Sequence, residues 1–395
     1  MTKRTAIIGG GAAGFFLAIN LKEMCPKMNI AIFERSNKVL SKVKISGGGR
    51  CNCTNSFENV DNMMSVYPRG HRLMKRLFHT FDNHDTMRWF ENHGVALTTQ
   101  DDHCVFPKAQ DSQVIIDCFM KLAKKYDIDI YCRKEISSLN SLKDYDYVAV
   151  TTGGSPRGRG LEWLRILGHE TTVCVPSLFS LNIDSKDLRE LMGTVVNSAT
   201  VFLPGLKYRS NGPLLITHWG VSGPAILKLS SHGALVLHDH NYNMPLFINW
   251  ISHNENETLE TLLTIANANG QKLVSSIRPY GLPQRLWDYL VNKALIMKTE
   301  ARWNTISKKD FNRMVNTLCC DKYDISGRGT HKEEFVTCGG IALNSIDNTT
   351  MRSKYVENMY FAGEILDIDG ITGGFNFQAA WTTAYVAAKS IALKQ

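Results

Sequence analysis

The sequence predicts an α/β fold in which one parallel-sheet domain is interrupted by a large insertion. Three observations indicate this arrangement. A strand, a glycine turn, a helix and a second strand follow one another in the first 34 residues. The middle of the chain is first rich in Val, Leu, Phe and Thr with turn residues between, and then helical in pattern. Strand and helix patterns of the first kind return near the C-terminus.

The length of the chain supports this division. At 395 residues it exceeds what one hydrophobic core usually organises. We expect residues 1–190 to form the first part of the α/β domain and residues 336–395 to complete it. Residues 191–335 then form an inserted domain, β-rich over 195–250 and helical over 256–320.

The N-terminal elements form a βαβ unit. Thr5–Ile8 is predicted as a buried strand, Phe15–Met24 as a helix that stops before Pro26, and Asn29–Glu34 as a second strand. Strands joined in this way lie parallel. Further along, the pattern predicts helices around 70–93 and 111–126, a strand at Tyr145–Thr152, helices at Glu257–Asn267, Pro283–Ile296 and Lys308–Leu318, a strand at Asn358–Ala362 and a last helix at Ala379–Leu393.

Composition and charge narrow the classes of partner. The chain is 44% hydrophobic and 21% charged, as globular proteins are, with a net charge of +8. Basic residues are spread evenly and no run of five or more Lys or Arg occurs, which argues against a nucleic-acid partner. No segment reaches the roughly 18 apolar residues that a membrane span needs. A small-molecule partner is expected, and the oligomeric state is left open.

The cysteines and histidines predict neither disulfides nor a metal site. The ten cysteines show no C-x-x-C and no paired zinc-ligand spacing. A chain of this size needs no disulfide to fold, so reduced thiols in the cytoplasm are expected. His79, His84, His93 and His103 do not share one helical face. The N-terminus resembles a secretory leader only superficially, because Gly9 ends the apolar stretch that begins at Ala6.

The first glycine turn predicts a dinucleotide site. Gly9 to Gly14 fit the pattern G-x-G-x-x-G, between a strand and a helix, and Glu34 ends the next strand. Gly9 permits the tight turn, Gly11 lets the backbone approach a diphosphate, and Gly14 allows close helix–strand packing. The helix N-terminus attracts the anionic diphosphate, and Glu34 can accept hydrogen bonds from ribose hydroxyls.

Two further segments favour FAD, bound non-covalently, over NAD alone. Residues 46–55 hold three consecutive glycines with donors such as Arg50 and Asn52, which suits a flat ligand. Residues 360–378 form a strand that ends in Gly363 and Glu364, then a glycine-rich turn, then a second helix start. The positive end of that helix would stabilise negative charge on the reduced flavin ring.

We therefore expect a cofactor site built from both ends of the chain. Its residues are Gly9, Gly11, Ala12, Ala13, Gly14, Glu34, Arg35, Lys42, Ser46, Gly47, Gly49, Arg50, Asn52, Thr152, Gly153, Gly154, Gly363, Glu364, Asp367, Gly373, Gly374, Phe375 and Asn376.

Two residues are candidates for catalysis. His218, within the block Thr217–Pro224, could transfer a proton, although a structural turn explains that block equally well. Arg50 is the second candidate. Cys51 and Cys53 form C-x-C, not the C-x4-C of flavin disulfide reductases, so small buried side chains are the favoured interpretation.

The segments described above resemble the YhiN/BaiN-type NAD(P)/FAD-dependent oxidoreductases, also known as aminoacetone-oxidase-like flavoproteins. The resemblance rests on the glycine turn and on the blocks Ile45–Asn55, Thr151–Pro156, Thr217–Leu227 and Thr337–Thr383, the last of which is the most specific. It implies a discontinuous Rossmann-like FAD-binding domain with an inserted β-barrel-like and helical domain. The stretch Arg157–Trp163 departs from the family pattern, so no substrate contact is carried over there.

Three functions remain open at this stage. The first is an FAD-dependent oxidoreductase in which hydride passes from NAD(P)H through flavin N5 to, or from, an organic substrate. No second G-x-G-x-x-G occurs, so the nicotinamide would dock only transiently. The second is a flavin-dependent RNA-modifying enzyme. A basic, aromatic-lined face on the insertion would favour this function. The third is a non-catalytic flavin-binding protein.

Overall fold

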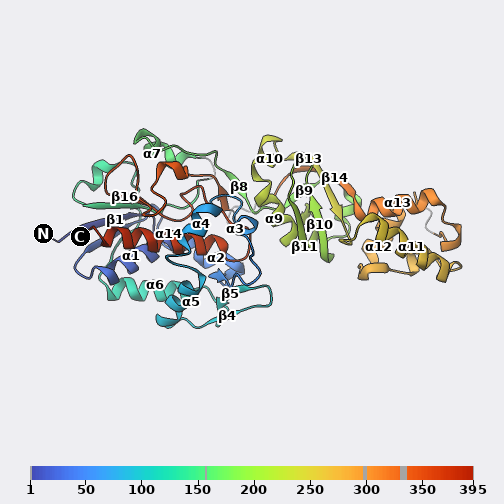
Figure 1. Cartoon of the computed structure of the whole chain (residues 1–395), viewed down its shortest axis with the longest axis horizontal. Helices are drawn as coiled ribbons and strands as arrows, with labels where there is room; N and C mark the ends of the chain where they lie inside the picture. Colours follow the sequence, from blue (N-terminus) through green and yellow to red (C-terminus); the bar gives the residue numbers. More distant parts are fainter. Residues whose placement is uncertain (1, 156–157, 297–299, 330–335, 395) are drawn as a thin grey trace. The chain divides into compact units, whose positions relative to one another are not determined.

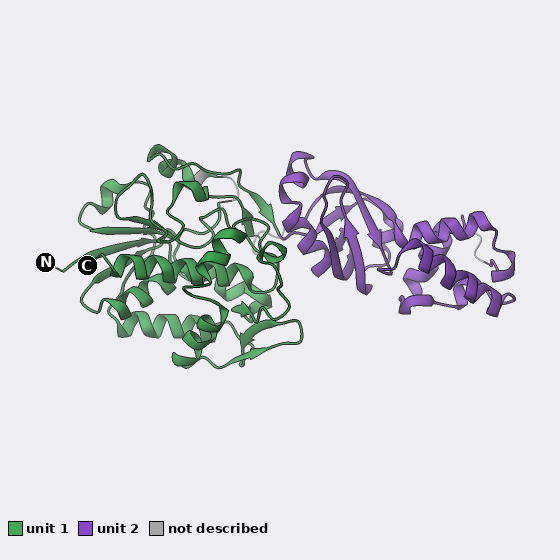
Figure 2. Ribbon diagram, in the orientation of Figure 1, with its two compact units in different colours: residues 1–177, 331–395 green, residues 178–330 purple. Residues whose placement is uncertain are grey.

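The computed structural model describes residues 2–394 except 156–157, 297–299 and 330–335 (Figure 1). The chain divides into two compact units (Figure 2). Unit 1 comprises Met1–Ser177 and His331–Gln395, and unit 2 comprises Leu178–Thr330. The expected boundary at residue 190 is therefore corrected to 177. The reason is the strand β9 (Leu181–Ile183), which pairs within the barrel of unit 2.

Unit 1 is built on a parallel five-stranded sheet of order β16-β7-β1-β2-β6. The strands are β1 (Arg4–Ile8), β2 (Asn29–Phe33), β6 (Asp129–Tyr131), β7 (Tyr147–Val150) and β16 (Met359–Phe361). Strand β16 pairs with β7, Met359 opposite Val148. The C-terminal segment thus completes the sheet that the N-terminal βαβ unit begins, as the sequence predicts.

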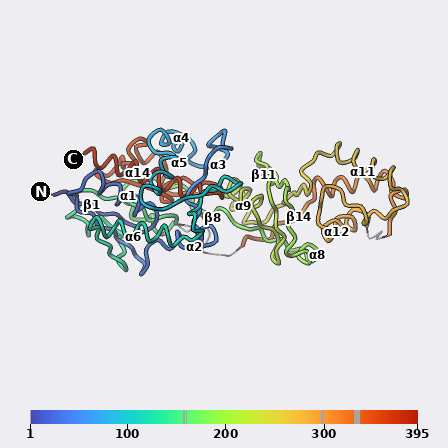
Figure 3. Tube along the Cα trace, turned by 90° about the horizontal axis from the view of Figure 1, so that it is seen from below, coloured from blue at the N-terminus to red at the C-terminus, as the bar shows by residue number. Residues whose placement is uncertain are grey.

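Two long helices join the chain ends on this sheet. Helix α1 (Ala12–Met24) packs along α14 (Phe375–Ala392), and α6 (Gln113–Lys125) packs on α1; the blue and red helices lie side by side in Figures 1 and 3. Phe16 and Trp381 are fully buried between α1 and α14, with ring centroids 5.1 Å apart. The six alanines of α14 have short side chains, which permits this close approach of the two helices.

The remaining elements of unit 1 are short. They are α2 (Ser41–Gly49), α3 (Met63–Val66), α4 (His71–Leu77), α5 (Asn83–Asn92) and α7 (Glu162–Ile166), a sheet of β3 (Thr54–Asn55), β5 (Cys104–Pro107) and β4 (Leu97–Thr99), and the pair β8 (Val175–Ser177) and β15 (Val336–Cys338). The helix expected over 70–93 is interrupted. Asp82 starts α5 as its N-cap, in a reciprocal capping box with Asp85, and so separates α5 from α4.

Unit 2 contains a closed barrel of order β10-β11-β12-β9-β14-β13. The strands besides β9 are β10 (Val195–Phe202), β11 (Arg209–Thr217), β12 (Gly220–Ser222), β13 (Asn243–Asn249) and β14 (Asp321–Arg328). Alternate residues face inward, as Val201 and Ile248 do, and both are fully buried. The short α8 (Lys186–Arg189) follows β9.

Helices α9 (Pro224–His232) and α10 (Ala234–Asp239) lie within residues 195–250, the stretch expected to be β-rich. Gly223 takes a positive φ of 93°, and Pro224 occupies the first helical position, where its missing N–H costs nothing. The buried Ile226 and Leu229 then hold α9 against β11.

A helical part interrupts the barrel between β13 and β14. It consists of α11 (Glu255–Asn269), α12 (Gln284–Ala294) and α13 (Lys308–Cys319), which match the stretch expected to be helical except that α11 begins one residue earlier. Helix α13 packs against α11 and α12. Among the described residues, no helix has the length and apolar character that crossing a membrane requires.

Candidate cofactor site

The turn between β1 and α1 is shaped by two glycines that the protein itself requires. A Cβ at Gly9, whose φ is 113°, would lie 2.5 Å from the carbonyl oxygen of Thr151. A Cβ at Gly14 would lie 2.1 Å from the carbonyl oxygen of Gly9. Both are distances that packed atoms do not reach, so the fold alone dictates glycine at these two positions.

Gly11 differs, because the protein leaves the space beside it open. Apart from its two chain neighbours, no described residue has a heavy atom within 4 Å of where its Cβ would be. Gly11 is also the N-cap of α1 and offers that helix no side-chain cap. The first-turn amides around Ala12 and Ala13 therefore face a cradle that a side chain would fill, next to the positive end of a 13-residue helix. This arrangement fits an anionic group such as a diphosphate.

Glu34 is held beside this turn at the end of β2. One carboxylate oxygen, Oε2, accepts a hydrogen bond of 2.9 Å from the Gly10 N–H, and Oε1 accepts one of 2.8 Å from the Ser36 N–H. Each oxygen keeps a lone pair, so Glu34 can still accept from hydroxyl groups of a ligand. Its neighbour Arg35 is exposed on the surface.

The C-terminal segment reaches the first turn of α1 at Gly363. Its φ is 79°, and a Cβ placed there would lie 2.8 Å from the Cβ of Ala13. The Gly363 N–H donates to Thr383 Oγ1 at 2.9 Å, which ties this turn to α14. The structure thus brings the two expected halves of the site together within unit 1.

The start of α14 is the second helix N-terminus of the site. Gly374, its N-cap, has a φ of 91°, and a Cβ there would lie 2.3 Å from the carbonyl oxygen of Thr54. With its amide turned so that the oxygen faces α14, Asn52 accepts from the Gly374 N–H at 3.1 Å and donates to Thr54 O at 2.8 Å. Through this amide Asn52, which is expected to bind the cofactor, joins residues 46–55 to α14. Gly373 accepts a further bond of 3.1 Å from Asn55 Nδ2.

A charged cluster forms around Glu364. Its Oε2 pairs with Lys42 Nζ at 2.7 Å, and its Oε1 accepts from the Thr337 N–H at 2.8 Å. Gly154 lies against this carboxylate, since a Cβ there would be 2.4 Å from Oε1. Gly153 precedes it with a φ of 72°, and Thr152 is exposed. Lys42, Gly154 and Glu364 therefore do converge, as expected.

Phe375 and Asn376 serve the architecture of the site. The Phe375 ring is buried, 5.1 Å from the ring of Phe57. The Asn376 amide accepts from the Gly370 N–H at 2.8 Å and donates to the Gly370 carbonyl at 2.9 Å, which clamps the glycine-rich turn in front of α14. Both were expected to bind the cofactor; in the structure the Phe375 side chain packs in the core, and the Asn376 amide bonds Gly370.

Residues 46–50 form a sharp reversal at the end of α2. Ser46 leaves the helical conformation with a ψ of 147°, and Gly47 and Gly48 take positive φ values, as does Gly49. The Arg50 guanidinium lies over the Phe106 ring, 4.3 Å from its centroid, and donates to Gly47 O at 3.2 Å. Arg50 remains partly exposed, with donors left for a ligand.

Sequence reasoning missed a buried ion pair between distant segments. Arg69, just before α4, donates through Nε and Nη2 to the two carboxylate oxygens of Asp369. Ser177 Oγ donates to the same carboxylate at 3.0 Å. Burial raises the pKa of Asp369, and Arg69 opposes that rise. Burial and the neighbouring Asp369 also raise the pKa of Asp367, a residue expected in the site.

Thr151 was also missed. Its Oγ1 donates to the carbonyl groups of Ile8 and Gly9, at 3.1 and 3.0 Å, and so fixes the first glycine turn from the neighbouring strand. The available signal was its place at the end of β7, where the carboxyl ends of parallel strands meet.

Two further candidates lie outside this cluster. His218 occupies the turn between β11 and β12 of unit 2, exposed, with its ring 4.3 Å from that of Trp219. Cys51 and Cys53 are buried thiols with sulfurs 4.0 Å apart, and all ten cysteines are free.

The parallel sheet, the glycine turn and the second helix start define a Rossmann-type α/β domain that carries an inserted barrel-and-helix unit. The chain belongs to the family described as HI0933-like protein Rossmann domain, which it matches over residues 3–390. This confirms the resemblance inferred from the sequence blocks.

Named relatives are similar over nearly the whole chain. The ribosomal RNA dihydrouridine synthase of Haemophilus influenzae is 27% identical over 410 residues, which cover 98% of this chain and 97% of the relative. The 3-dehydro-bile acid delta(4,6)-reductase of Clostridium scindens is 23% identical over 417 residues, covering 98% and 99%. Among solved structures, the 3-ketosteroid delta1-dehydrogenase of Sterolibacterium denitrificans shares the fold, with a TM-score of 0.51 at 11% identity over 100% of both chains.

Proposed function

We propose that this protein is an FAD-dependent oxidoreductase. The observation that carries the proposal is the contact of Gly363 with Ala13, which places a second glycine-rich segment beside the open cradle at Gly11. One helix start alone suits any nucleotide. Two such segments, drawn from opposite ends of the chain into one unit, suit a long dinucleotide that both must hold.

Each part of the site has a distinct task in this proposal. The amides of the first α1 turn hold the diphosphate, and Glu34 accepts from the adenosine ribose hydroxyls. Glu364 and the start of α14 serve the flavin half of the molecule, where the helix dipole favours negative charge on the reduced ring. When bound, FAD supplies hydride transfer between a nicotinamide and an organic substrate. His218 and Arg50 stay our candidates for proton transfer and substrate orientation.

The names of the relatives support reduction of a carbon–carbon double bond as the reaction. Dihydrouridine is uridine whose ring double bond has been reduced, and a delta(4,6)-reductase acts on double bonds at numbered ring positions. In both cases a hydride adds to one carbon and a proton to its neighbour. We propose the same reaction class here, with NAD(P)H as the reductant. The ten free thiols suit a reducing compartment such as the cytoplasm.

A second candidate narrows the substrate to RNA. The ribosomal RNA dihydrouridine synthase of Haemophilus influenzae is 27% identical to this chain, and the match covers 98% of this chain. The even spread of basic residues argues against nucleic acid, whereas this similarity argues for it. An organic small molecule and an RNA base are therefore the two substrates to be compared.

Anaerobic stopped-flow spectroscopy tests the proposal. The purified protein is mixed with NADH or NADPH, and then with either a conjugated cyclic enone or a uridine-containing ribosomal RNA fragment. We expect rapid bleaching of the flavin by one nicotinamide and its return with one acceptor. A protein that carries flavin but is bleached by neither nicotinamide would be a flavin-binding protein without this activity. Bleaching with no return by either acceptor would refute double-bond reduction of these substrates.

A further inference from the structure

The outer face of the barrel in unit 2 carries a row of two neighbouring aromatic side chains with a cationic side chain at each end. Four adjacent strands contribute to it in register: Arg209 of β11 lies opposite Phe202 of β10, Phe202 opposite Phe247 of β13, and Phe247 opposite Lys322 of β14. Their inward neighbours Val201 and Ile248 are fully buried, so this row points away from the barrel interior.

The side chains of this row are stacked on one another. The rings of Phe202 and Phe247 lie 5.2 Å apart at an angle of 10°, and the Arg209 guanidinium lies 4.0 Å above the Phe202 ring. Both rings are partly exposed, and Arg209 and Lys322 are exposed. One acidic side chain at this row is Asp324, which lies 3.6 Å from Lys322. Parallel rings with flanking cations make a platform for flat, anionic ligands.

A second row beside the first is made of hydroxyl and amide groups. Asn211 Nδ2 donates to Thr200 Oγ1 at 3.1 Å and to Ser252 Oγ at 2.9 Å, and Ser252 Oγ donates to the Ser198 carbonyl at 3.2 Å. Thr200 is two residues from Phe202, and Asn211 two from Arg209, so both rows lie on the same face of the barrel. This second row offers donors and acceptors next to the stacked rings.

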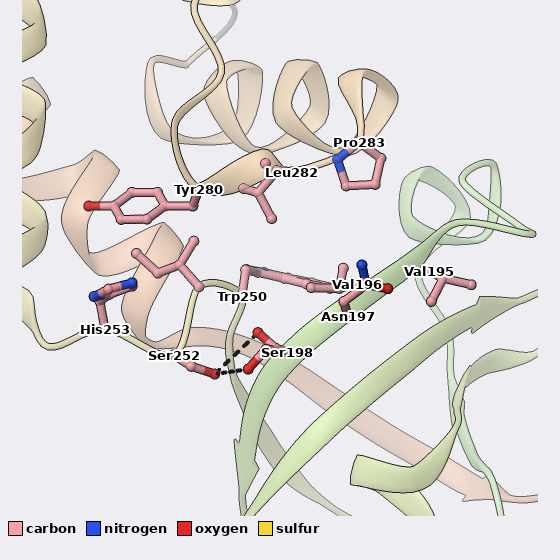
Figure 4. Close-up of a pocket in the computed structure, with 12 residues that line it drawn as sticks. Val195, Val196, Asn197, Ser198, Trp250, Ser252, His253, Tyr280, Leu282 and Pro283 are labelled. Atoms are coloured by element: carbon pink, nitrogen blue, oxygen red, sulfur yellow. Dashed lines mark hydrogen bonds between the residues drawn. The ribbon is translucent and has the colours of Figure 1, made fainter. Parts of the chain in front are cut away.

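The hydroxyl row leads into a pocket of about 520 Å³. Figure 4 shows Ser198 and Ser252 on one side, with Trp250 beside them and Tyr280 and Leu282 opposite. The Tyr280 hydroxyl is buried and has no hydrogen-bond partner among the described residues. The aromatic row, the hydroxyl row and the pocket thus form one continuous surface, which we call the barrel face.

We propose that the barrel face binds unpaired RNA. Arg209 and Phe247 cover the two faces of the Phe202 ring, so a base stacks at the Phe247 end of this row. Phosphates meet Arg209 and Lys322, and ribose hydroxyls or base edges bond the amide and hydroxyl row. Unpaired nucleotides are the occupant that uses all three features, because the bases of a duplex are not free to stack on a protein. The proposal rests on the RNA candidate of the proposed function and supplies its docking surface.

Binding of a labelled single-stranded oligouridylate to the flavin-loaded protein, followed by fluorescence anisotropy, tests this proposal. The double variant F202L/F247L keeps the apolar volume but removes the stacking platform, and we expect it to bind at least about tenfold more weakly. R209Q is expected to lower the salt dependence of binding by about one released ion. The matched control K308Q removes a charge from α13, outside the barrel face, and should bind as the wild type does. Flavin bleaching by NAD(P)H should be unchanged in all variants.

The outcomes distinguish a wrong assignment of the RNA-binding surface from a wrong choice of RNA as the substrate. If the wild type binds the RNA and F202L/F247L binds it equally well, the barrel face is not the RNA-binding surface, while RNA remains a candidate substrate. If the wild type is bleached by NAD(P)H but retains no RNA, the RNA candidate and the barrel face both fall, and the oxidoreductase stands. Equal affinity for a duplex of the same length would also overturn the proposal. A change of oligomeric state in F202L/F247L without an effect on RNA would show a self-association face instead. Should the double variant unfold, F247L alone replaces it.

Discussion

The Cβ of Ala13 lies against the backbone of Gly363, so that a methyl group added at Gly363 would approach it to 2.8 Å. These residues are the points where the N-terminal and C-terminal parts of the cofactor site touch. The contact leaves no room for a side chain on the C-terminal segment. It therefore offers a direct way to test whether the two ends form one structure.

The Ala13–Gly363 contact predicts coupling between two substitutions. Gly363→Ala adds the clashing methyl at a φ of 79°, and we expect it to cost about 1–3 kcal/mol of unfolding free energy. Adding Ala13→Gly removes the methyl it meets and should recover the steric part of that loss. Urea unfolding of the apoprotein measures this as a double-mutant cycle, with a coupling of about 0.5–3 kcal/mol. Strictly additive effects would mean that the two segments do not touch.

The two glycines at either side of the α1 start predict opposite phenotypes. The Cβ added by Gly11→Val meets no atom of the described residues within 4 Å beyond its chain neighbours, so the apoprotein should keep its stability while FAD affinity falls at least about tenfold. Gly14→Ala places a methyl 2.1 Å from the Gly9 carbonyl and should destabilise the fold by about 3 kcal/mol. Thermal unfolding and flavin content distinguish them. Unchanged flavin content in Gly11→Val would show that the diphosphate lies elsewhere.

The carboxylate of Glu34 predicts a graded series. Glu34→Gln keeps one acceptor oxygen but loses the charge, and Glu34→Ala loses both acceptors and releases the Gly10 N–H. Hydrogen bonds to a charged group contribute about 1.5–3 kcal/mol each, so FAD affinity should fall about tenfold in the first variant and further in the second. Fluorescence titration of the apoprotein with FAD gives the order. Equal affinity in all three proteins would contradict a role at the ribose.

The pair His93–Glu23 predicts how stability depends on pH. Burial lowers the pKa of His93. The hydrogen bond to Glu23 Oε1 at 2.9 Å, the hydrogen bond to the Trp89 carbonyl and the negative charge of Glu23 together outweigh burial, so the pKa is raised above its ordinary value of 6.5. The stabilisation is fully present below pH 6.5 and is lost as the pH rises through the raised pKa. We expect His93→Gln to flatten the decline on the alkaline side in urea unfolding at a series of pH values. The same alkaline decline in His93→Gln and the wild type would contradict this.

The local sequence pattern was enough to predict the N-terminal half of the candidate cofactor site. The spacing of Gly9, Gly11 and Gly14 between a strand and a helix, with Glu34 at the next strand end, specifies geometry that a short stretch of chain enforces by itself. The return of the C-terminus to the sheet was also predictable, because its strand–turn–helix pattern repeats the N-terminal one. The pairing of β16 with β7 confirms the second of these inferences.

Pairings between residues far apart in the chain could not be predicted from the sequence, because local patterns carry no information about distant partners. Arg69 and Asp369 lie 300 residues apart, and the sequence pattern around either residue does not indicate which residue it will pair with. In the sequence, Asn52 reads as a donor available to a ligand; only the structure shows that its amide accepts from the Gly374 N–H. The three-residue strand β9 is too short to reveal by pattern that it belongs to the barrel, which is why the unit boundary was placed too late.

The flavin content of the purified protein tests the central claim most directly. The protein is purified without added cofactor, its visible spectrum is recorded, and any cofactor released by denaturation is identified by chromatography. We predict a yellow protein that releases one intact FAD per chain on unfolding, since both glycine segments hold the cofactor without a covalent bond. A colourless protein that also fails to take up added FAD would contradict the account.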